Sequence, residues 1–496
     1  MFVRKAAKLE RASIVSIPFQ RRWVHIPLVI EGKEVSTGES SPVFSHEAPY
    51  KVIQTYSFLN SGTFASTVPR ICAASDVGFQ EWSSKTFIER IEVMKKVSDL
   101  LKNRKDEFVK AHQEIGGPEW FSNFNINHLI LQIELYISQI SQPEGEVAKA
   151  LIPLLAMTIR QPMGSILSMA PWNAPAILCG RSIAAPLAAG CSVVLKSSER
   201  APLISYLLVK VFHDAGIPPN ALQLVHTKPE DSETFVDVML SNPLIKKVNF
   251  TGSTDVGRKI AITAAKYLKP TLLELGGKNY SIVDNPLDLK QSAQNILWSA
   301  WSHQGQICMC IDSVYIHESI YDDYCDELLR CAQTLVRDPV YSIPQRDTSQ
   351  VDKIMDLIDD ALQKGAIMLY GKRSDEDTGS VIHPMILKDV TSEMKLDSTE
   401  SFGPILTVYK YTDKEEVVQT LNKATSCLKA SIWSHNISEA IALAKKIESA
   451  GVHINSSTIY DEPTLPHGGF KESGMGRFNS SWGYEEFTYT KTLTIN

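Results

Sequence analysis

Hydrophobic positions between residues 84 and 108 recur every three or four residues. Phe87, Ile91, Met94 and Val97 follow this spacing, and Lys, Glu and Asp stand between them. Such a pattern places the apolar side chains in one stripe along a helix. It predicts a surface helix over 84–108 that packs on a core.

After Met163 the pattern changes to short apolar runs that alternate with longer helical stretches. The runs SILSMA, SVVLK and ALQLV are each followed by a helical stretch, and two of these stretches end on Gly190 and Gly216, as helix C-termini commonly do. Strict strand–helix alternation predicts a parallel sheet with crossover helices, the doubly wound architecture of nucleotide-binding domains.

Beyond Leu275 a second set of apolar runs begins, including YSIVD, SVYIH and ILTVYK, which predicts a second α/β domain. The β-rich segment 145–163 interrupts the first domain. Together with the C-terminal 478–496 it is predicted to form strands that reach another subunit. The predicted domains are therefore 1–144 with 164–274, then 275–477, with 145–163 and 478–496 as an oligomerisation element.

Charge and composition exclude several classes of protein. The net charge is −6, and the only basic cluster lies in the first 22 residues, which does not suggest a nucleic-acid partner. No apolar run is long enough to span a membrane. The eight cysteines form no disulfide framework, which favours a reducing compartment, most simply the cytoplasm. The basic N-terminus leaves two alternatives open, a mitochondrial presequence or a short arm before the first strand.

Two strand ends carry groups suited to a nucleotide. In FTGSTDVGRKI an apolar strand runs into Gly252, Ser253 and Gly257 at the start of a helix, where backbone N–H groups can face a phosphate. An ordinary strand-to-helix turn would look the same. Lys196 and Glu199 follow the strand SVVLK, where a carboxylate can accept ribose hydroxyls. A solvated strand end is the alternative.

Glu274 stands inside the apolar stretch TLLELGG. A carboxylate with apolar neighbours is a candidate for a raised pKa and for a general base. A structural glutamate that is paired with a cation is the alternative.

The sequence GQICMC contains two cysteines, Cys308 and Cys310. No second Cys or His cluster with zinc spacing accompanies them, so no metal site is predicted. A disulfide between residues two apart is geometrically poor. Two interpretations of these cysteines remain, a nucleophile and an inert buried thiol. Asn173 follows Trp172 in APWNAP, just after the strand SILSMA, where its amide could stabilise an oxyanion.

Seven motifs together resemble the NAD(P)-dependent aldehyde dehydrogenase family over nearly the whole chain. In order along the sequence they are PWN (171–173), VVLKSSE (193–199), FTGSTDVG (250–257), LELGGK (273–278), GQIC (305–308), ESFGP (400–404) and PHGGFKESGMGR (466–477). The resemblance implies a Rossmann-like domain, a catalytic domain and a small β oligomerisation element.

The resemblance also implies roles for individual residues. It makes Cys308 the nucleophile and Cys310 a bystander, with Asn173 and the Cys308 backbone N–H holding the oxyanion and Glu274 activating water. The cofactor positions that it implies are Trp172, Lys196, Glu199, Gly252, Ser253, Gly257, Leu275, Glu400 and Phe402. A carboxylate at Glu199 would repel a 2′-phosphate, which favours NAD over NADP as the cofactor.

The C-terminal motif is most similar to the branch that acts on benzaldehyde, salicylaldehyde and vanillin. The substrate pocket is expected to contain Ala174, Ile307, Met309 and Tyr460, because a small residue at 174 leaves space for a flat ring. Two alternatives stay open, a succinate-semialdehyde type of dehydrogenase and a catalytically idle binding protein of the same fold. Arg181 could serve a semialdehyde as a pocket residue, although a helix-surface charge is the simpler interpretation. The resemblance further implies a homodimer or homotetramer.

Overall fold

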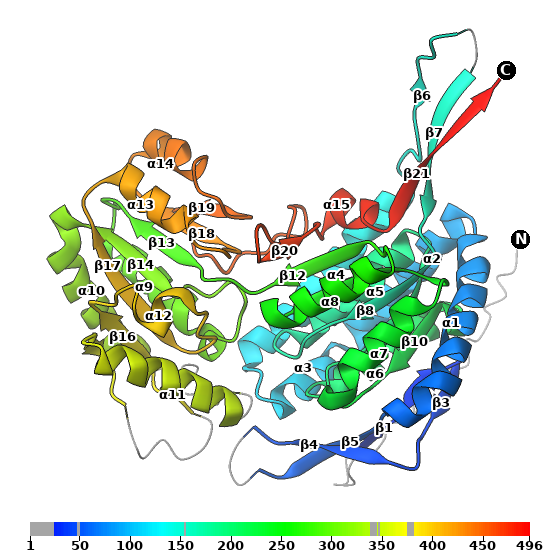
Figure 1. Cartoon of the computed structure of the whole chain (residues 1–496), viewed down its shortest axis with the longest axis horizontal. Coiled ribbons are helices and arrows are strands. Elements are labelled where there is room, and N and C mark those ends of the chain that lie inside the picture. Colours follow the sequence, from blue (N-terminus) through cyan, green and yellow to red (C-terminus); the bar gives the residue numbers. More distant parts are fainter. Residues whose placement is uncertain (1–23, 47–49, 153–154, 338–344, 346–347, 374–380) are drawn as a thin grey trace, which may run out of the picture.

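The chain folds around two large β-sheets in two lobes, and a narrow β-arm projects from one of them (Figure 1). The computed structural model describes residues 24–46, 50–152, 155–337, 345, 348–373 and 381–496. The basic N-terminal segment, for which a mitochondrial presequence was one of the two interpretations, lies outside these residues. No helix among the described residues is long and apolar enough to cross a membrane.

The first sheet confirms the doubly wound parallel architecture. Five parallel strands form its centre, in the order β12-β11-β8-β9-β10, and shorter strands complete its two edges. Its strands, in spatial order, are β20 (Gly474–Met475), β12 (Thr271–Leu275), β11 (Ile245–Gly252), β8 (Ser165–Met169), β9 (Ser192–Lys196), β10 (Leu222–Val225), β2 (Leu28–Ile30) and β3 (Lys33–Val35). The chain order reverses beside β8. Ligands of open α/β sheets bind at such a switch point, outside the carboxyl ends of the strands.

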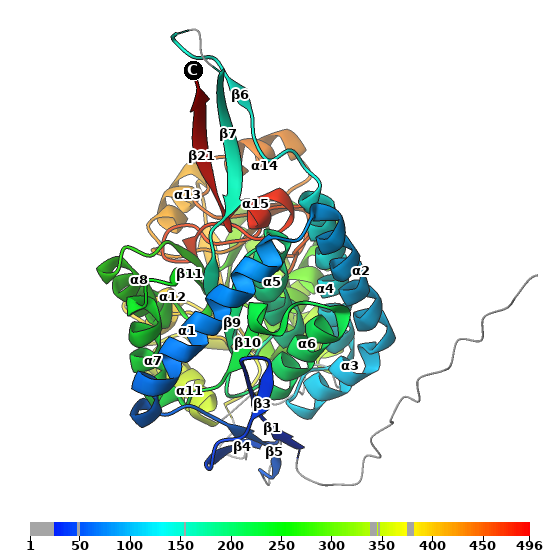
Figure 2. The same ribbon diagram turned by 90° about the vertical axis from the view of Figure 1, so that its right-hand side faces the viewer.

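Helices cover this sheet on both faces (Figures 1 and 2). They are α1 (Ser61–Ser83), α2 (Phe87–Asn103), α3 (Lys105–Glu114), α4 (Glu119–Ile140), α5 (Pro175–Ala188), α6 (Pro202–Ala215), α7 (Pro229–Ser241) and α8 (Thr254–Lys266). Every residue of α5 is buried, because this helix lies between the sheet and α4. A short sheet of β1 (Val24–Ile26), β5 (Val52–Ser57) and β4 (Ser40–Phe44) lies at the N-terminal side.

The single helix predicted over 84–108 is wrong in its bounds. A capping box at Thr86 starts α2, and the helix ends at Asn103, after which α3 begins. Met94 and Val97 are buried as expected, but Phe87 is 50% exposed because it occupies the first position of the helix.

The second sheet confirms the second α/β domain. Its strands, in spatial order, are β15 (Ile367–Tyr370), β16 (Met385–Lys388), β17 (Ile405–Tyr411), β14 (Ser313–His317), β13 (Tyr280–Val283), β18 (Ala430–Trp433) and β19 (Val452–Ile454). The helices of this lobe are α9 (Leu289–Trp301), α10 (Tyr321–Leu335), α11 (Thr348–Gln363), α12 (Lys395–Ser398), α13 (Lys414–Asn422) and α14 (Ile437–Ala444).

The arm consists of β6 (Val147–Ala148), β7 (Leu155–Pro162) and the C-terminal β21 (Thr488–Ile495), which pairs with β7 along its whole length. Two predicted boundaries need correction here. β20 lies inside the range predicted for the catalytic domain, but it pairs with β12 in the first sheet. Within 478–496, α15 (Ser480–Glu485) packs on α4 and α5, so among these residues the arm contains only β21.

Candidate active site

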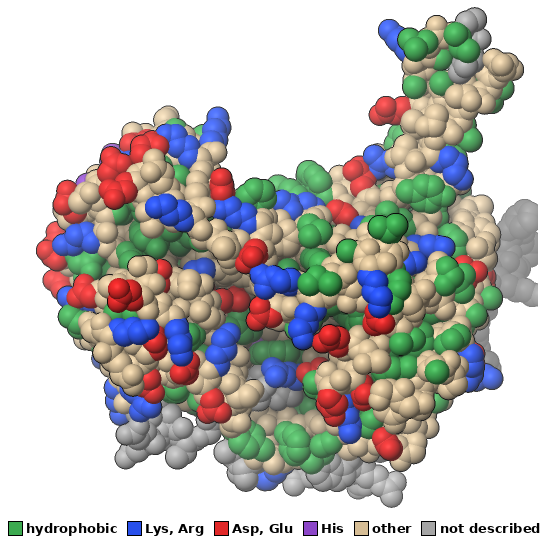
Figure 3. Space-filling model, viewed as in Figure 1, with side chains coloured by type: hydrophobic (Ala, Val, Ile, Leu, Met, Phe, Trp, Pro, Cys, Tyr) green, Lys and Arg blue, Asp and Glu red, His purple; other side chains and the backbone are tan. Residues whose placement is uncertain are grey.

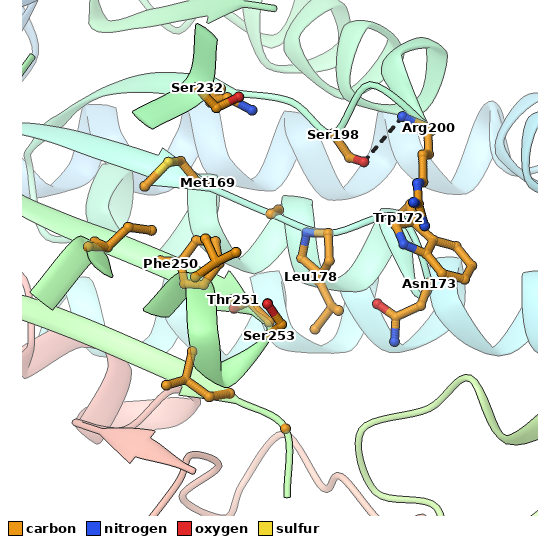
Figure 4. Close-up of a pocket in the computed structure, with 18 of the residues that line it drawn as sticks. Met169, Trp172, Asn173, Leu178, Ser198, Arg200, Ser232, Phe250, Thr251 and Ser253 are labelled. Carbon is orange, nitrogen blue, oxygen red and sulfur yellow. Dashed lines mark hydrogen bonds between the residues drawn. The ribbon is translucent and has the colours of Figure 1, made fainter. Parts of the chain in front are cut away.

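A cavity of about 600 Å³ opens at the carboxyl ends of the strands of the first sheet and extends to the second lobe. Figure 4 shows Trp172 and Asn173 on one side of it and Phe250, Thr251 and Ser253 on the other. The predicted residues that line it are Trp172, Asn173, Lys196, Glu199, Gly252, Ser253, Glu274, Leu275, Cys308, Glu400 and Phe402. The structure thus brings together residues that are up to 230 positions apart in the chain.

Gly257, the remaining predicted cofactor residue, does not line this cavity but allows the elements around it to pack closely. It lies in the first turn of α8, and a Cβ there would collide with the side chain of Leu275. The glycine therefore allows α8 to approach β12 closely, which brings the start of the helix to the cavity.

Cys308 is the cysteine that faces the cavity. Its Sγ donates a hydrogen bond to Oε1 of Glu274 at 3.5 Å. Burial raises the pKa of the Cys308 thiol well above its ordinary value, and the negative charge of Glu274 acts in the same direction. The thiol is therefore protonated at rest and has a carboxylate in position to accept its proton.

Cys310 points away from this pair. It is buried, and its Sγ donates to the backbone carbonyl of Ser302 at 3.7 Å. Burial also raises the pKa of the Cys310 thiol. The geometry supports Cys308 as the nucleophile and Cys310 as its inert neighbour.

Glu274 is surrounded by cations and donors in the interior, where it is 1% exposed. Its Oε2 lies 3.0 Å from Nη2 of Arg181, and its Oε1 lies 3.5 Å from Nε2 of His467. Burial alone would raise the pKa of Glu274, but the hydrogen bond from His467 and the charge of Arg181 outweigh it and lower the pKa. The expectation of a raised pKa is therefore wrong, and this carboxylate is ionised and ready to accept a proton at neutral pH.

Arg181 contributes with His467 to the lowered pKa of Glu274. The interpretation of Arg181 as a helix-surface charge is wrong. The side chain is 0% exposed within α5. Its guanidinium bridges Glu274 and Asp461, with 3.3 Å from Nη1 to Oδ2 of Asp461, and stacks 4.4 Å over the ring of Phe478. Since all sides of α5 are covered, a charged side chain on this helix needs buried partners.

Asn173 lies in the short loop between β8 and α5 and is buried. Its side-chain Nδ2 donates to the backbone carbonyl of Gln306 at 2.9 Å, two residues before Cys308. This bond orients the amide beside the nucleophile. A primary amide has a second N–H, which could hold the oxygen of a bound carbonyl.

Asn279 is a site residue that the sequence interpretation missed. Its buried amide donates to the carbonyl oxygens of Cys308 at 2.8 Å and Cys310 at 2.9 Å, and its Oδ1 accepts from the backbone N–H groups of Leu428 and Lys429. It fixes the backbone of the nucleophile against the strand region before β18. The signal that could have revealed it was a polar residue directly before the apolar run of β13.

A second group of side chains, here called the aldehyde-side cluster, packs against Cys308, and its member Leu178 also lines the cavity. It contains three of the predicted pocket residues, Ala174, Ile307 and Met309, together with Phe121, Ile177, Leu178, Cys310 and Leu428, and Trp120 and Ile459 pack against it. Tyr460 lies elsewhere: it is 43% exposed and packs edge-on against His453. The neighbouring Ile459 takes the place that was expected for Tyr460, because side chains of consecutive residues point in different directions.

The cavity fits an extended dinucleotide. Gly276 forms part of its wall, and a Cβ there would collide with the Glu400 carboxylate. Burial, together with the negative charge of Asp312, raises the pKa of Glu400 to about 8. Glu199 also lines the cavity, where its carboxylate is 3.6 Å from Nε of Arg200, and the Arg200 guanidinium lies over the Trp172 ring (Figure 4). Two carboxyl groups that could bind hydroxyls, those of Glu199 and Glu400, thus line the cavity.

The sequence model of the aldehyde dehydrogenase family matches residues 45–493. The chain belongs to the aldehyde dehydrogenase family. A vanillin dehydrogenase of Pseudomonas sp. (strain HR199 / DSM 7063) is 36% identical over 95% of this chain and 98% of its own length. An NADP⁺ succinate-semialdehyde dehydrogenase of Schizosaccharomyces pombe is 29% identical over 85% of this chain and 87% of its own.

Solved structures of the family share the whole architecture. The crystal structure of a salicylaldehyde dehydrogenase from Pseudomonas putida G7, complexed with salicylaldehyde, matches with a TM-score of 0.89 at 30% identity, over 95% of this chain and 98% of that one. The protein is therefore an oxidoreductase that acts on the aldehyde group, and the resemblance seen in its seven motifs is confirmed.

Proposed function

We propose that this aldehyde dehydrogenase oxidises an aromatic aldehyde of the benzaldehyde, salicylaldehyde or vanillin type to its carboxylic acid, with NAD as the cofactor. The observation that carries the proposal is the aldehyde-side cluster, an apolar group that includes Cys308 and the two neighbouring aromatic rings of Trp120 and Phe121. A flat apolar ring would gain contacts there without leaving polar groups unsatisfied.

The first chemical step takes place at Cys308. Its Sγ gives its proton to Glu274 and attacks the carbonyl carbon, which forms a C–S bond and an oxyanion. The second N–H of Asn173 and the backbone N–H of Cys308 stabilise this oxyanion. Removal of hydride from the same carbon leaves a thioester on Cys308.

Glu274 then acts on water. Its ionised carboxylate takes a proton as the water attacks the thioester carbon, the C–S bond breaks, and the acid leaves. The lowered pKa of Glu274 keeps it ionised at neutral pH for this role.

The cofactor would be held by residues from both lobes. Lys196 and Glu199 would bind the adenosine ribose, Gly252 and Ser253 the phosphates, and Glu400 the second ribose. When bound, a nicotinamide dinucleotide supplies the hydride acceptor. A carboxylate at Glu199 disfavours a 2′-phosphate, so we propose NAD over NADP.

The structure weakens the case for a semialdehyde substrate. Arg181, the cation considered for its carboxylate, already pairs with Glu274 and Asp461. Binding a substrate carboxylate there would require one of these buried ion pairs to break, which is costly.

A direct test is the rate of NADH formation, followed by absorbance, with benzaldehyde, vanillin and succinate semialdehyde. We expect kcat/KM to be higher for the aromatic aldehydes by at least about tenfold, since a matched apolar pocket contributes 1–3 kcal/mol of discrimination. A preference for the semialdehyde would reject the aromatic substrate, and no NADH with any aldehyde would indicate an idle binding protein.

We also propose that the arm joins subunits in a homodimer or homotetramer. Its exposed apolar side chains include Val147, Leu155, Leu493 and Ile495, and Figure 3 shows hydrophobic groups along it. An unpaired strand edge with apolar side chains favours pairing with another chain. Light scattering of the full chain and of one lacking 488–496 would test this, with loss of the oligomer expected for the shortened chain.

A further inference from the structure

Arg200 lines the cavity from the loop between β9 and α6, directly after the motif VVLKSSE (193–199). Because it stands outside the seven motifs, the resemblance implies no role for it. Its guanidinium lies 5.5 Å from the centre of the Trp172 ring, and its Nε lies 3.6 Å from the carboxylate of Glu199. This cation therefore contacts two of the predicted cofactor residues.

The local backbone directs Arg200 toward the cavity. Its backbone N–H donates to Oγ of Ser198 at 3.2 Å, and the backbone N–H of Ala201 donates to the carbonyl oxygen of Ser198, also at 3.2 Å (Figure 4). These bonds form a tight turn after β9, and the flat indole of Trp172 then orients the guanidinium. A side chain that contacts within the chain already hold loses less entropy when it binds a ligand.

The contacts of Arg200 place it at the middle of the predicted cofactor residues. They run from Glu199, proposed to bind the adenosine ribose, through Arg200 to Trp172. The Trp172 ring in turn meets the ring of Phe402 edge-on, with 6.4 Å between the centroids. Figure 4 shows Trp172 between Arg200 and Asn173. Since the diphosphate of a nicotinamide dinucleotide joins its two riboses, Arg200 faces the part of the cavity where the diphosphate would lie.

The start of α8 offers the diphosphate only part of the positive charge that it needs. A diphosphate bridge carries two negative charges, whereas a helix N-terminus is equivalent to about half an elementary charge. Ser253 lies at this helix start, on the side of the cavity that faces Trp172 (Figure 4). A full positive charge on the Trp172 side would therefore stabilise the diphosphate further.

The cavity contains other cations, but two of them already have close partners. Among the described residues that line it, these cations are Lys196, Lys259 and Lys353. Lys259 pairs with Glu233 at 3.1 Å, and Lys353 donates to the backbone carbonyl of Glu400 at 3.4 Å.

The contact between Arg200 and Glu199 is weaker than these. Its 3.6 Å exceed the length of a hydrogen bond, and the two side chains are 33% and 30% exposed, so water screens their attraction. A guanidinium also has five N–H donors in a fixed plane, which match two phosphate oxygens at once. Arg200 can thus keep Glu199 beside it and still bind a phosphate.

We propose that Arg200 binds the diphosphate of the nicotinamide dinucleotide from the wall opposite the start of α8. Its N–H groups donate to phosphate oxygens, while Gly252 and Ser253 face the same phosphates from the other wall. This inference rests on the proposed binding of the cofactor and does not depend on which aldehyde is oxidised.

The test measures dissociation constants in the absence of aldehyde. Binding of NADH is followed by its fluorescence, and ADP and adenosine are measured by their displacement of NADH. Only adenosine lacks the diphosphate. In Arg200→Met we expect Kd for NADH and for ADP to rise at least about tenfold, because charge-assisted hydrogen bonds to phosphate are lost, whereas Kd for adenosine should change by less than about twofold.

Two further variants make the comparison specific. Arg258→Met is the matched control, because Arg258 also carries a positive charge on α8 but pairs with Glu472 at 3.0 Å and is not one of the residues that line the cavity. Its Kd for ADP should stay within about twofold of wild type. Arg200→Lys should bind ADP with an intermediate affinity, since it keeps the charge but loses the planar fork.

Three results would overturn the inference. The first is an unchanged Kd for ADP in Arg200→Met, or an equal rise in Arg258→Met. The second is an equal loss of affinity for adenosine, which would mean that Arg200 only maintains the shape of the cavity. The third is a loss for adenosine 2′-phosphate at least as large as that for ADP, which would place Arg200 at a 2′-phosphate. A failure to oxidise aromatic aldehydes would reject the proposed substrate alone, because none of these measurements contains an aldehyde.

Discussion

Asn279 donates a hydrogen bond from its side-chain amide to the carbonyl oxygen of Cys308 at 2.8 Å. The same amide group also binds the carbonyl of Cys310, so one side chain holds the backbone on both sides of Met309. Cys308 is therefore positioned through its backbone as well as through its thiol.

Replacing Asn279 with Ala is expected to weaken both stability and catalysis. Each buried group that loses its partner costs about 1–3 kcal/mol, so the free energy of unfolding should fall by at least about 2 kcal/mol. The loosened backbone should also lower kcat. Denaturant unfolding and steady-state kinetics measure the two effects. Asn295→Ala is the control, since Asn295 binds only a carbonyl within its own helix, and equal behaviour of the two variants would contradict the assignment.

The two cysteines should respond very differently to substitution. Cys308→Ser is expected to lower kcat by at least about a thousandfold, because a hydroxyl is a far weaker nucleophile than a thiolate. Cys310→Ser should retain most of the activity, since its thiol donates to the carbonyl of Ser302 and not to Glu274. NADH formation under the same conditions compares them, and an inactive Cys310→Ser with an active Cys308→Ser would reverse the assignment.

Arg181 sets the charge of the interior, so its removal should change both stability and pH dependence. In Arg181→Met two buried carboxylates lose their cation, and we expect a loss of about 3–5 kcal/mol in the free energy of unfolding. Arg181 lowers the pKa of Glu274, which keeps the carboxylate ionised as the pH falls. Without it that pKa rises, so the acid limb of the kcat/KM profile should move to higher pH.

Arg90→Met provides the matched control for this prediction. Arg90 is also a buried arginine near α5, but its Nη1 donates to the backbone carbonyl of Ala188 and not to Glu274. Its loss should reduce stability without moving the acid limb. If the acid limb of the kcat/KM profile moves equally in both variants, Arg181 affects the pH dependence only through the stability of the fold.

The parallel strands and the positions at their ends could be predicted because both depend on local sequence. A buried parallel strand has a continuous apolar run, and Lys196 or Gly252 at its carboxyl end must lie at the ligand-binding edge. The order of strands in the sheet then brings β8 and β11 together, which explains why Trp172 and Ser253 meet in one cavity.

The buried ion pairs of Arg181 with Glu274 and Asp461 could not be predicted in this way. Arg181 and Asp461 are 280 residues apart in sequence, and neither segment shows that α5 is covered on every side. A charge on an otherwise apolar helix usually indicates the solvent face, so the pattern favoured the wrong interpretation. The lowered pKa of Glu274 has the same origin, since the sequence showed its apolar neighbours but not its distant cation.

Glu199 should determine the choice between the two dinucleotides. In Glu199→Ser the negative charge that disfavours a 2′-phosphate is removed, and we expect the ratio of kcat/KM for NAD to that for NADP to fall by at least about tenfold. Most of the change should appear in KM, because the role proposed for Glu199 is to bind the cofactor. Kinetics with both cofactors measures the ratio, and a preference that does not change would place the discrimination at another residue.

Ala174 should control the size of the aldehyde that reaches Cys308. It is buried in the aldehyde-side cluster beside Ile307 and Met309, at the position before α5. In Ala174→Phe a large ring would fill space that the proposal gives to the substrate, and overpacking of this kind costs about 1–3 kcal/mol. We expect kcat/KM for vanillin to fall by at least about tenfold while that for acetaldehyde stays within about threefold, because a two-carbon aldehyde needs none of that space. Parallel losses for both aldehydes would mean that the phenyl ring disturbs Asn173 instead, and an unchanged value for vanillin would place the aromatic ring away from Ala174.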